Sequence, residues 1–172
     1  FEDLKREGKI LHLGVSVEKV EEALKAIEYP TVETVQIIFN MFRHRPAGLF
    51  FEQAAKRKIG VIVRVPLASG LLSGKFTSAT PFGAEDHRQF NRKGEAFDRG
   101  ETFAGVDYET GLMAVEELKR VLPDHTPLAQ WALRWVLMFP EVSTVIPGAS
   151  RLDQLDSNLA AAAVRALSEA EM

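Results

Sequence analysis

The sequence predicts an α/β fold in which four parallel strands alternate with helices that cover the sheet. Four short apolar runs rich in β-branched residues recur along the chain, and helical periodicity follows them. The first three runs start about 25 residues apart, the period of the strand–helix unit that occurs eight times in the roughly 250 residues of a (β/α)8 TIM barrel. The 172 residues hold four such units, so we expect half of a barrel.

The predicted strands cover residues 10–17, 34–42, 60–67 and 142–148. Their apolar side chains follow one another almost without interruption, which is typical of a parallel sheet with both faces covered. Gly8 and Gly60 come just before two of these strands, and we interpret both as C-terminal caps of the preceding helices.

Apolar periodicity predicts helices between and after the strands. Residues 20–27 place four apolar side chains on one face, and residues 49–55 continue the pattern after the second strand. Further helices are expected at 109–122, 127–139 and 151–163. Thr126 followed by Pro127 predicts an N-cap and a proline at the first helical position.

Residues 76–106 differ from the rest of the chain, because they are polar, rich in Gly, Asp and Arg, and without clear periodicity. Loops of this length in compact domains are usually functional or disordered. We interpret the segment as a loop that covers a ligand, and a mobile insertion is the alternative. Its phenylalanines are either apolar contacts for that ligand or anchors that hold the loop down: Phe76, Phe82, Phe90, Phe97 and Phe103.

The composition argues against several classes of function. The net charge is -3 and no extended run of Lys and Arg is present, so the electrostatic footprint of a nucleic-acid partner is missing. No apolar run approaches the roughly 20 residues of a membrane helix, and no signal peptide is recognisable, so we expect a cytoplasmic protein without a membrane partner. With no cysteine and four scattered histidines, no metal site is expected.

The chain opens on residues 1–7, which look like the end of an amphipathic helix without a preceding cap. We therefore expect residues 1–172 to be a single C-terminal half-barrel fragment, with the N-terminal half absent. Four strands on their own would leave two unpaired edges and an uncovered interior. Marginal stability or association is the expected consequence.

Four segments resemble, in order and at suitable spacings, the fifth to eighth strand regions of the aldo-keto reductase family. They are GKILHLGVSV, VQIIFN, RVPLASGLLSGKF and VIPGASRLDQLDSNL, and the loop sequence FNRKGEAFDRGETFAGV fits the same family. The resemblance implies that the whole protein is an NADP-dependent oxidoreductase, using NADPH to reduce a small-molecule carbonyl substrate, an aldehyde or ketone, to an alcohol. The family's catalytic Tyr, Lys, Asp and His come from the first four strands, so no catalytic residue is assigned here. Residues 1–172 alone are expected to be inactive.

The resemblance also implies an NADP(H) site on residues that follow the strands. Ser16 and Gln36 can both donate and accept hydrogen bonds, as a nicotinamide carboxamide requires, whereas Val17 replaces a family Asn and removes one expected bond. A strand-end cap and a satisfied core amide are the structural alternatives for Ser16 and Gln36. Arg64 stands where the family commonly has an aromatic residue. Its guanidinium is expected to stack on the nicotinamide and to favour NADPH over the positively charged NADP+, unless it pairs with a carboxylate of the missing half.

The phosphates are expected at two further segments. In the Gly/Ser turn after the third strand, small residues let backbone N–H groups approach a pyrophosphate that Lys75 can neutralise, and a plain loop is the alternative. The candidates there are Pro66, Leu67, Ser69, Gly70, Leu72 and Lys75. After the fourth strand a helix N-terminus favours an anion, and the fork of Arg151 suits a 2′-phosphate. The candidates there are Gly148, Ser150, Arg151, Gln154 and Asn158, of which the last two lie on one helical face that is otherwise a solvated surface.

Two other functions stay open on the sequence. The chain fits a nicotinamide-binding regulatory subunit of aldo-keto reductase type, which keeps the cofactor site while chemistry is secondary. It also fits a different TIM barrel with a phosphate site after its last two strands.

Overall fold

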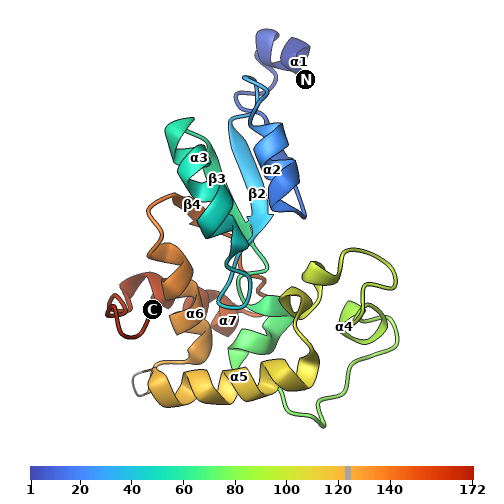
Figure 1. Ribbon diagram of the computed structural model, residues 1–172, viewed down its shortest axis with the longest axis vertical. Helices are drawn as coiled ribbons and strands as arrows, with labels where there is room; N and C mark the ends of the chain where they lie inside the picture. The colour runs from blue at the N-terminus through green and yellow to red at the C-terminus, as the bar shows by residue number, and fades with distance from the viewer. Residues whose placement is uncertain (123–124) are drawn as a thin grey trace.

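The computed structural model describes residues 1–122 and 125–172. Within these residues, four strands form one sheet in the order β1-β2-β3-β4, and every neighbouring pair is parallel. The strands are β1 (Gly14–Ser16), β2 (Thr34–Ile38), β3 (Gly60–Arg64) and β4 (Val142–Val145). The predicted parallel sheet is confirmed, and helices follow its strands as expected (Figure 1).

The two faces of the sheet differ sharply in burial because side chains alternate along each strand. Val35, Ile37, Val61 and Val63 point to the helix-covered face and are at most 1% exposed. On the opposite face, the side chains of β1 and β4 that alternate with them are exposed. This second face is the one that a closed barrel encloses.

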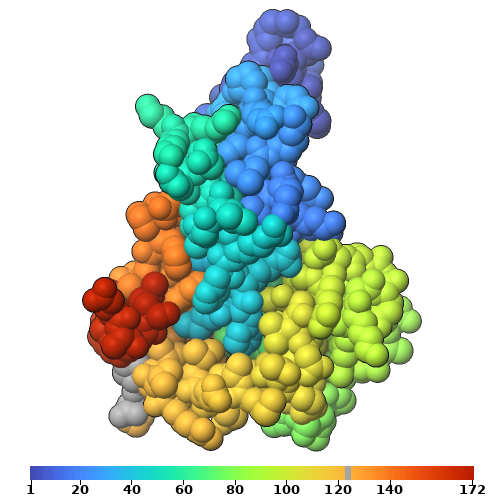
Figure 2. All heavy atoms as spheres, in the orientation of Figure 1, coloured from blue at the N-terminus to red at the C-terminus, as the bar shows by residue number. Residues whose placement is uncertain are grey.

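Helices α2 (Val20–Ala26) and α3 (Glu52–Lys56) lie beside the sheet, and α3 continues from a π-helix, η1 (Ala47–Phe51). Helices α5 (Tyr108–Val121), α6 (Leu128–Leu137) and α7 (Leu152–Ala160) gather toward the carboxyl ends of the strands, and α7 is followed by a short 3-10 helix, η5 (Ala161–Ala163) (Figure 1). Helix α1 (Glu2–Arg6) stands out at the narrow end of the molecule in Figure 2. None of the helices in the described ranges is long and apolar enough to cross a bilayer.

The strands are shorter than the sequence predicts. β1 starts at Gly14 because its partner in the ladder, Thr34, is the first residue of β2, and Leu11 before it is 77% exposed. β3 ends at Arg64 because Val65 adopts a left-handed φ of 51°. Hydrophobicity marks where a strand lies, whereas the pairing register decides where it ends.

The cap predicted at Gly8 is confirmed by its φ of 70° directly after the last turn of α1. The cap predicted at Gly60 is wrong, because Lys58 takes the left-handed position (φ 57°) and Gly60 is already the first residue of β3.

The start predicted for the helix at 127–139 is also wrong by one residue. Pro127 is the N-cap, α6 begins at Leu128, and among the described residues no side-chain hydrogen bond, from Thr126 or another residue, caps the helix. Because proline fixes φ near its helical value, it fits both the N-cap and the first helical position, and its presence in the sequence does not show which of the two it occupies.

The segment 76–106 contains short helices rather than irregular chain throughout. They are α4 (His87–Phe90), η3 (Arg99–Glu101) and η4 (Phe103–Gly105). Asn91 is fully buried, and its side-chain oxygen accepts hydrogen bonds from the N–H groups of Ala96 (2.8 Å) and Phe97 (3.0 Å). Of the phenylalanines, Phe103 is an anchor at 1% exposure, while Phe90 is 41% exposed. This packing favours the interpretation as a ligand-covering loop over that as a mobile insertion.

The uncovered face of the sheet generates the first prediction. Residues 1–172 produced alone should self-associate or unfold without a cooperative transition, because in the described parts of the chain the outer edges of β1 and β4 have no strand partner and one sheet face is not covered by helices. Analytical ultracentrifugation combined with calorimetry measures both properties. A monomer that melts in one cooperative transition would contradict the prediction.

Candidate functional site

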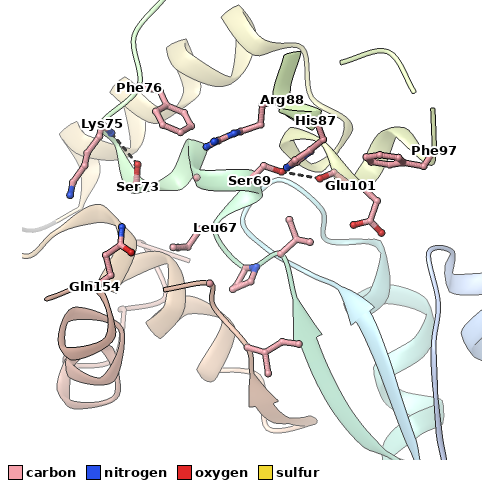
Figure 3. A pocket seen from close by; sticks show the side chains of 15 residues that line it. Leu67, Ser69, Ser73, Lys75, Phe76, His87, Arg88, Phe97, Glu101 and Gln154 are labelled. Atoms are coloured by element: carbon pink, nitrogen blue, oxygen red, sulfur yellow. Dashed lines mark hydrogen bonds between the residues drawn. The ribbon is translucent and has the colours of Figure 1, made fainter. Parts of the chain in front are cut away.

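A cavity of about 680 Å³ lies at the carboxyl ends of β3 and β4, the usual place for ligands in parallel α/β folds (Figure 3). Its walls come from the turn after β3, the connection from β4 to α7, and the loop of residues 76–106. The lining residues are Val65, Pro66, Leu67, Ser69, Gly70, Ser73, Lys75, Phe76, His87, Arg88, Phe97, Glu101, Ile146, Gly148 and Gln154.

Ser16, the last residue of β1, meets Gln36, the middle residue of β2. They are partners in the strand register, and Gln36 Nε2 donates a hydrogen bond of 3.0 Å to Ser16 Oγ. This bond leaves the Gln36 Oε1 acceptor and the Ser16 hydroxyl proton for a further group. Neither residue lines the cavity. The next residue, Val17, accepts a hydrogen bond from Arg64, which pairs with the lining residue Glu101.

Arg64 ends β3 and is held by the chain itself. Its guanidinium forms an ion pair with Glu101, and Nη2 donates a 2.9 Å hydrogen bond to the carbonyl oxygen of Val17. Arg64 is therefore paired with a carboxylate, as the alternative interpretation expected, but this carboxylate belongs to the 76–106 loop instead of a missing half. Because the pair carries no net charge, the guanidinium no longer presents the unbalanced cation that was expected to disfavour NADP+.

The turn after β3 forms η2 (Ala68–Ser73), and three consecutive residues, Ala68, Ser69 and Gly70, have positive φ. The Ser69 hydroxyl donates to the carbonyl oxygen of Glu101 (2.9 Å) and accepts from the N–H of Phe103 (3.1 Å). Ser69 therefore fastens the 76–106 loop to the turn. Its hydroxyl is already satisfied within the chain.

Of the other candidates in this turn, Pro66, Leu67, Gly70 and Lys75 line the cavity. Leu72 does not line it, because its side chain is fully buried in the core and packs against the turn from the core side. Within the described parts of the chain, the Lys75 ammonium makes no ion pair.

Of the five candidates after β4, Gly148 and Gln154 line the cavity, and Ile146, which was not a candidate, lines it as well. Ser150 donates hydrogen bonds from its N–H (2.8 Å) and its hydroxyl (3.1 Å) to Gln154 Oε1, and Asn158 Nδ2 donates to the carbonyl oxygen of Gly148 (3.4 Å).

Arg151 does not line the cavity either. It forms an exposed two-bond pair with Asp153, at 2.9 and 3.0 Å. Ser150, Arg151 and Asn158 thus form hydrogen bonds within residues 148–158, and none of the three lines the cavity.

The 76–106 loop contributes residues that the sequence did not single out for the site, among them His87, Arg88 and Glu101. Arg88 is positioned by the ion pair with Asp86 (2.6 Å), and its guanidinium carbon lies 4.8 Å from the ring centroid of Phe82. The hydrogen bonds from the Arg88 side chain lower the pKa of Asp86 to about 2. The richness of the loop in Arg was visible in the sequence, but without periodicity nothing indicated which arginine faces the cavity.

Arg88 lies against the turn at Gly70. A Cβ added to Gly70 would lie 2.9 Å from the Phe76 ring and 3.7 Å from Arg88 Nη1. Only glycine permits this approach, since Gly70 also has a φ of 93°. The described residues contain no group of three His, Cys, Asp or Glu side chains that could hold a metal ion.

Comparison with known proteins gives one family. The sequence model of the aldo/keto reductase family matches residues 1–172. The chain is 27% identical over 172 residues to the uncharacterized oxidoreductase YqkF of Bacillus subtilis (strain 168), covering 100% of this chain and 51% of that protein. It is 27% identical over 161 residues to L-glyceraldehyde 3-phosphate reductase of Escherichia coli (strain K12), covering 90% and 45%. The chain thus spans about half the length of the curated relatives it matches.

Solved structures agree with the sequence comparison. The chain superposes on the glycerol dehydrogenase AKR11B4 of Gluconobacter oxydans with a TM-score of 0.75 at 25% identity, over 98% of this chain and 49% of that one. The matched portion confirms half of a TIM barrel as the fold. The chain is also 25% identical to the aldo-keto reductase yakc [NADP(+)] of Schizosaccharomyces pombe, over 92% of this chain and 45% of that protein. It is 31% identical to a probable voltage-gated potassium channel subunit beta of Arabidopsis thaliana, over 77% of this chain and 38% of that protein.

The Asp86–Arg88 pair generates a pH prediction. Because the folded-state pKa of Asp86 lies below its ordinary value of 3.8, the pair stabilises the fold above about pH 4, and this contribution disappears as the pH falls toward 2. In the full-length protein, Asp86→Asn should lower the free energy of unfolding at pH 5, and the difference from wild type should shrink between pH 4 and pH 2. Urea denaturation at each pH measures it; a difference that does not depend on pH would contradict this role.

Proposed function

Because the chain belongs to the aldo/keto reductase family, we propose that it is the cofactor-binding half of an enzyme that uses NADPH to reduce aldehydes or ketones to alcohols. The observation that carries the proposal is the cavity that joins the turn after β3, the start of α7 and the 76–106 loop. Seven of the residues expected to bind the cofactor line this cavity: Pro66, Leu67, Ser69, Gly70, Lys75, Gly148 and Gln154.

The Ser16–Gln36 pair fits the carboxamide of a nicotinamide. The carboxamide presents an NH2 donor and a carbonyl acceptor, and the pair has one free acceptor on Gln36 and one free donor on Ser16. Two such bonds would fix the orientation of the nicotinamide ring about its own axis. When bound, reduced nicotinamide supplies a hydride equivalent to the carbonyl carbon of the substrate.

The cavity itself fits the phosphates. Lys75 has no carboxylate partner in the described residues, and Arg88 is held rigidly by Asp86 beside Gly70. Both cations border a turn whose small residues leave the backbone accessible. Arg151 lies between the lining residues Gly148 and Gln154 in the sequence and forms an exposed ion pair with Asp153. When NADPH binds, the Arg151 guanidinium is proposed to leave the Asp153 carboxylate and pair with the 2′-phosphate.

The proton for the carbonyl oxygen is proposed to come from outside residues 1–172. Tyr108 is 6% exposed and donates its hydroxyl to the carbonyl oxygen of Thr77, and Tyr29 lies in the turn after α2. Neither tyrosine lines the cavity. The catalytic role of the chain is therefore to bind and orient the cofactor.

A regulatory subunit that binds the cofactor is the second candidate. It is favoured by the likeness to the protein named as a probable potassium channel subunit beta. The cavity suits both functions, because each needs the same dinucleotide.

Turnover distinguishes the two candidates. The full-length protein should bind NADPH and consume it when aldehydes or ketones are added, as followed by the loss of NADPH absorbance. Binding with no turnover over a broad carbonyl panel would favour the regulatory function. Failure to bind NADPH at all would contradict both.

Arg151 and Asp153 generate a prediction on cofactor choice. In the full-length protein, Arg151→Ala should raise the Kd for NADPH about tenfold and leave that for NADH almost unchanged, since only NADPH has a 2′-phosphate. Asp153→Asn should instead strengthen NADPH binding, because it frees the guanidinium.

Isothermal titration with both cofactors measures these constants. Lys56→Ala is the matched control, since it removes an exposed, paired cation on α3, away from the cavity. Equal losses for NADPH and NADH in Arg151→Ala would refute the assignment of Arg151 to the 2′-phosphate.

A further inference from the structure

The turn that forms one wall of the cavity begins with a strained residue. Val65 has a φ of 51°, a conformation that β-branched residues rarely adopt. It also precedes Pro66, and the proline ring pushes the residue before it toward extended backbone. Such a conformation persists only where the surroundings hold it in place.

Asn40 stabilises this conformation of Val65. It is fully buried just beyond the end of β2, and its Nδ2 donates a 2.9 Å hydrogen bond to the carbonyl oxygen of Val65. Its Oδ1 accepts a 2.9 Å bond from the N–H of Phe42, which fixes the amide from the other side. The Val65 carbonyl oxygen accepts a second bond, 3.1 Å long, from the N–H of Ala68. Asn40 therefore joins the ends of β2 and β3 at the strained residue.

Strain is concentrated around the same cavity. Seven non-glycine residues in the described chain have positive φ, and five of them belong to this turn or to the loop segment that Ser69 fastens to it. They are Val65, Ala68, Ser69, Phe103 and Ala104. If Val65 relaxed to negative φ, the direction of the chain entering Pro66 and Leu67 would change, and with it the wall that these residues form.

We propose that Asn40 is a positioning residue for the cofactor site. It does not line the cavity, and it acts through the backbone of Val65. The inference rests on the proposed function and adds to it the residue that keeps the wall in its binding conformation before the cofactor arrives.

A double-mutant cycle between Asn40 and Val65 in the full-length protein tests the proposal. Asn40→Ala should raise the Kd for NADPH about tenfold, because Val65 can then relax and the binding conformation becomes a minor one. In the Val65→Gly background, the same Asn40→Ala change should alter the Kd by less than about threefold, because glycine adopts positive φ without strain. Asn40→Asp keeps the acceptor for Phe42 but loses the donor to Val65, so it should weaken binding in the same way if Asn40→Ala does not fold.

A merely structural role for Asn40 gives a different pattern. Val35→Ala, a truncation of a fully buried residue on the helix-covered face of β2, is the control that lowers the melting temperature without touching the turn, and its Kd should stay within about twofold of wild type. Equal effects of Asn40→Ala in both Val65 backgrounds, or no effect on Kd in either, would overturn the proposal. If the wild type binds no NADPH, the proposed function fails and this inference fails with it; if the wild type binds and only the cycle fails, the proposed function stands.

Discussion

The parallel register of the four strands is the constraint on which the candidate site depends. Because Ser16 pairs with Gln36 and Ile38 with Arg64, the carboxyl ends of neighbouring strands meet at one edge of the sheet. The groups at this edge then bond to one another: Gln36 to Ser16, and Arg64 to the carbonyl oxygen of Val17. A one-residue slip in any strand would turn these polar side chains to the helix-covered face and the buried valines to the opposite one. The hydrophobic core therefore fixes the site as well as the fold.

A cavity forms at this edge because the chain after β3 adopts strained backbone conformations that neighbouring residues stabilise. Asn40 holds Val65, and Ser69 fastens the 76–106 loop through Glu101 and Phe103. The ion pair between Arg64 and Glu101 joins the same loop to β3. The loop is thus anchored through Glu101 and Phe103, while its segment around Arg88 is oriented by the local pair with Asp86. These contacts are present without a bound ligand, so they suit a cavity wall that is formed before the ligand binds.

The sequence predicted the sheet, its parallel order and most helices, because apolar periodicity is a local signal. It did not predict where helices and strands end or which side chains contact one another, because both depend on tertiary structure. The left-handed position lies at Lys58 instead of Gly60, and the side chain of Leu72 packs in the core although the residue belongs to the Gly/Ser turn. The partner of Arg64 lies 37 residues away, in a loop without periodicity, so no sequence pattern could have identified it. The family resemblance correctly indicated the family and the fold, whereas the assignment of individual residues to the cofactor stays a prediction.

Hydrogen–deuterium exchange of the full-length protein, with and without NADPH, tests whether these segments form one cofactor site. NADPH should slow exchange in residues 65–75, in the loop segment 96–104 and in residues 146–154, because residues of these three segments line one cavity. Exchange in α3, on the helix-covered side of the sheet, should not change. Slower exchange confined to segments away from the cavity, with none at residues 65–75, would show that NADPH binds elsewhere.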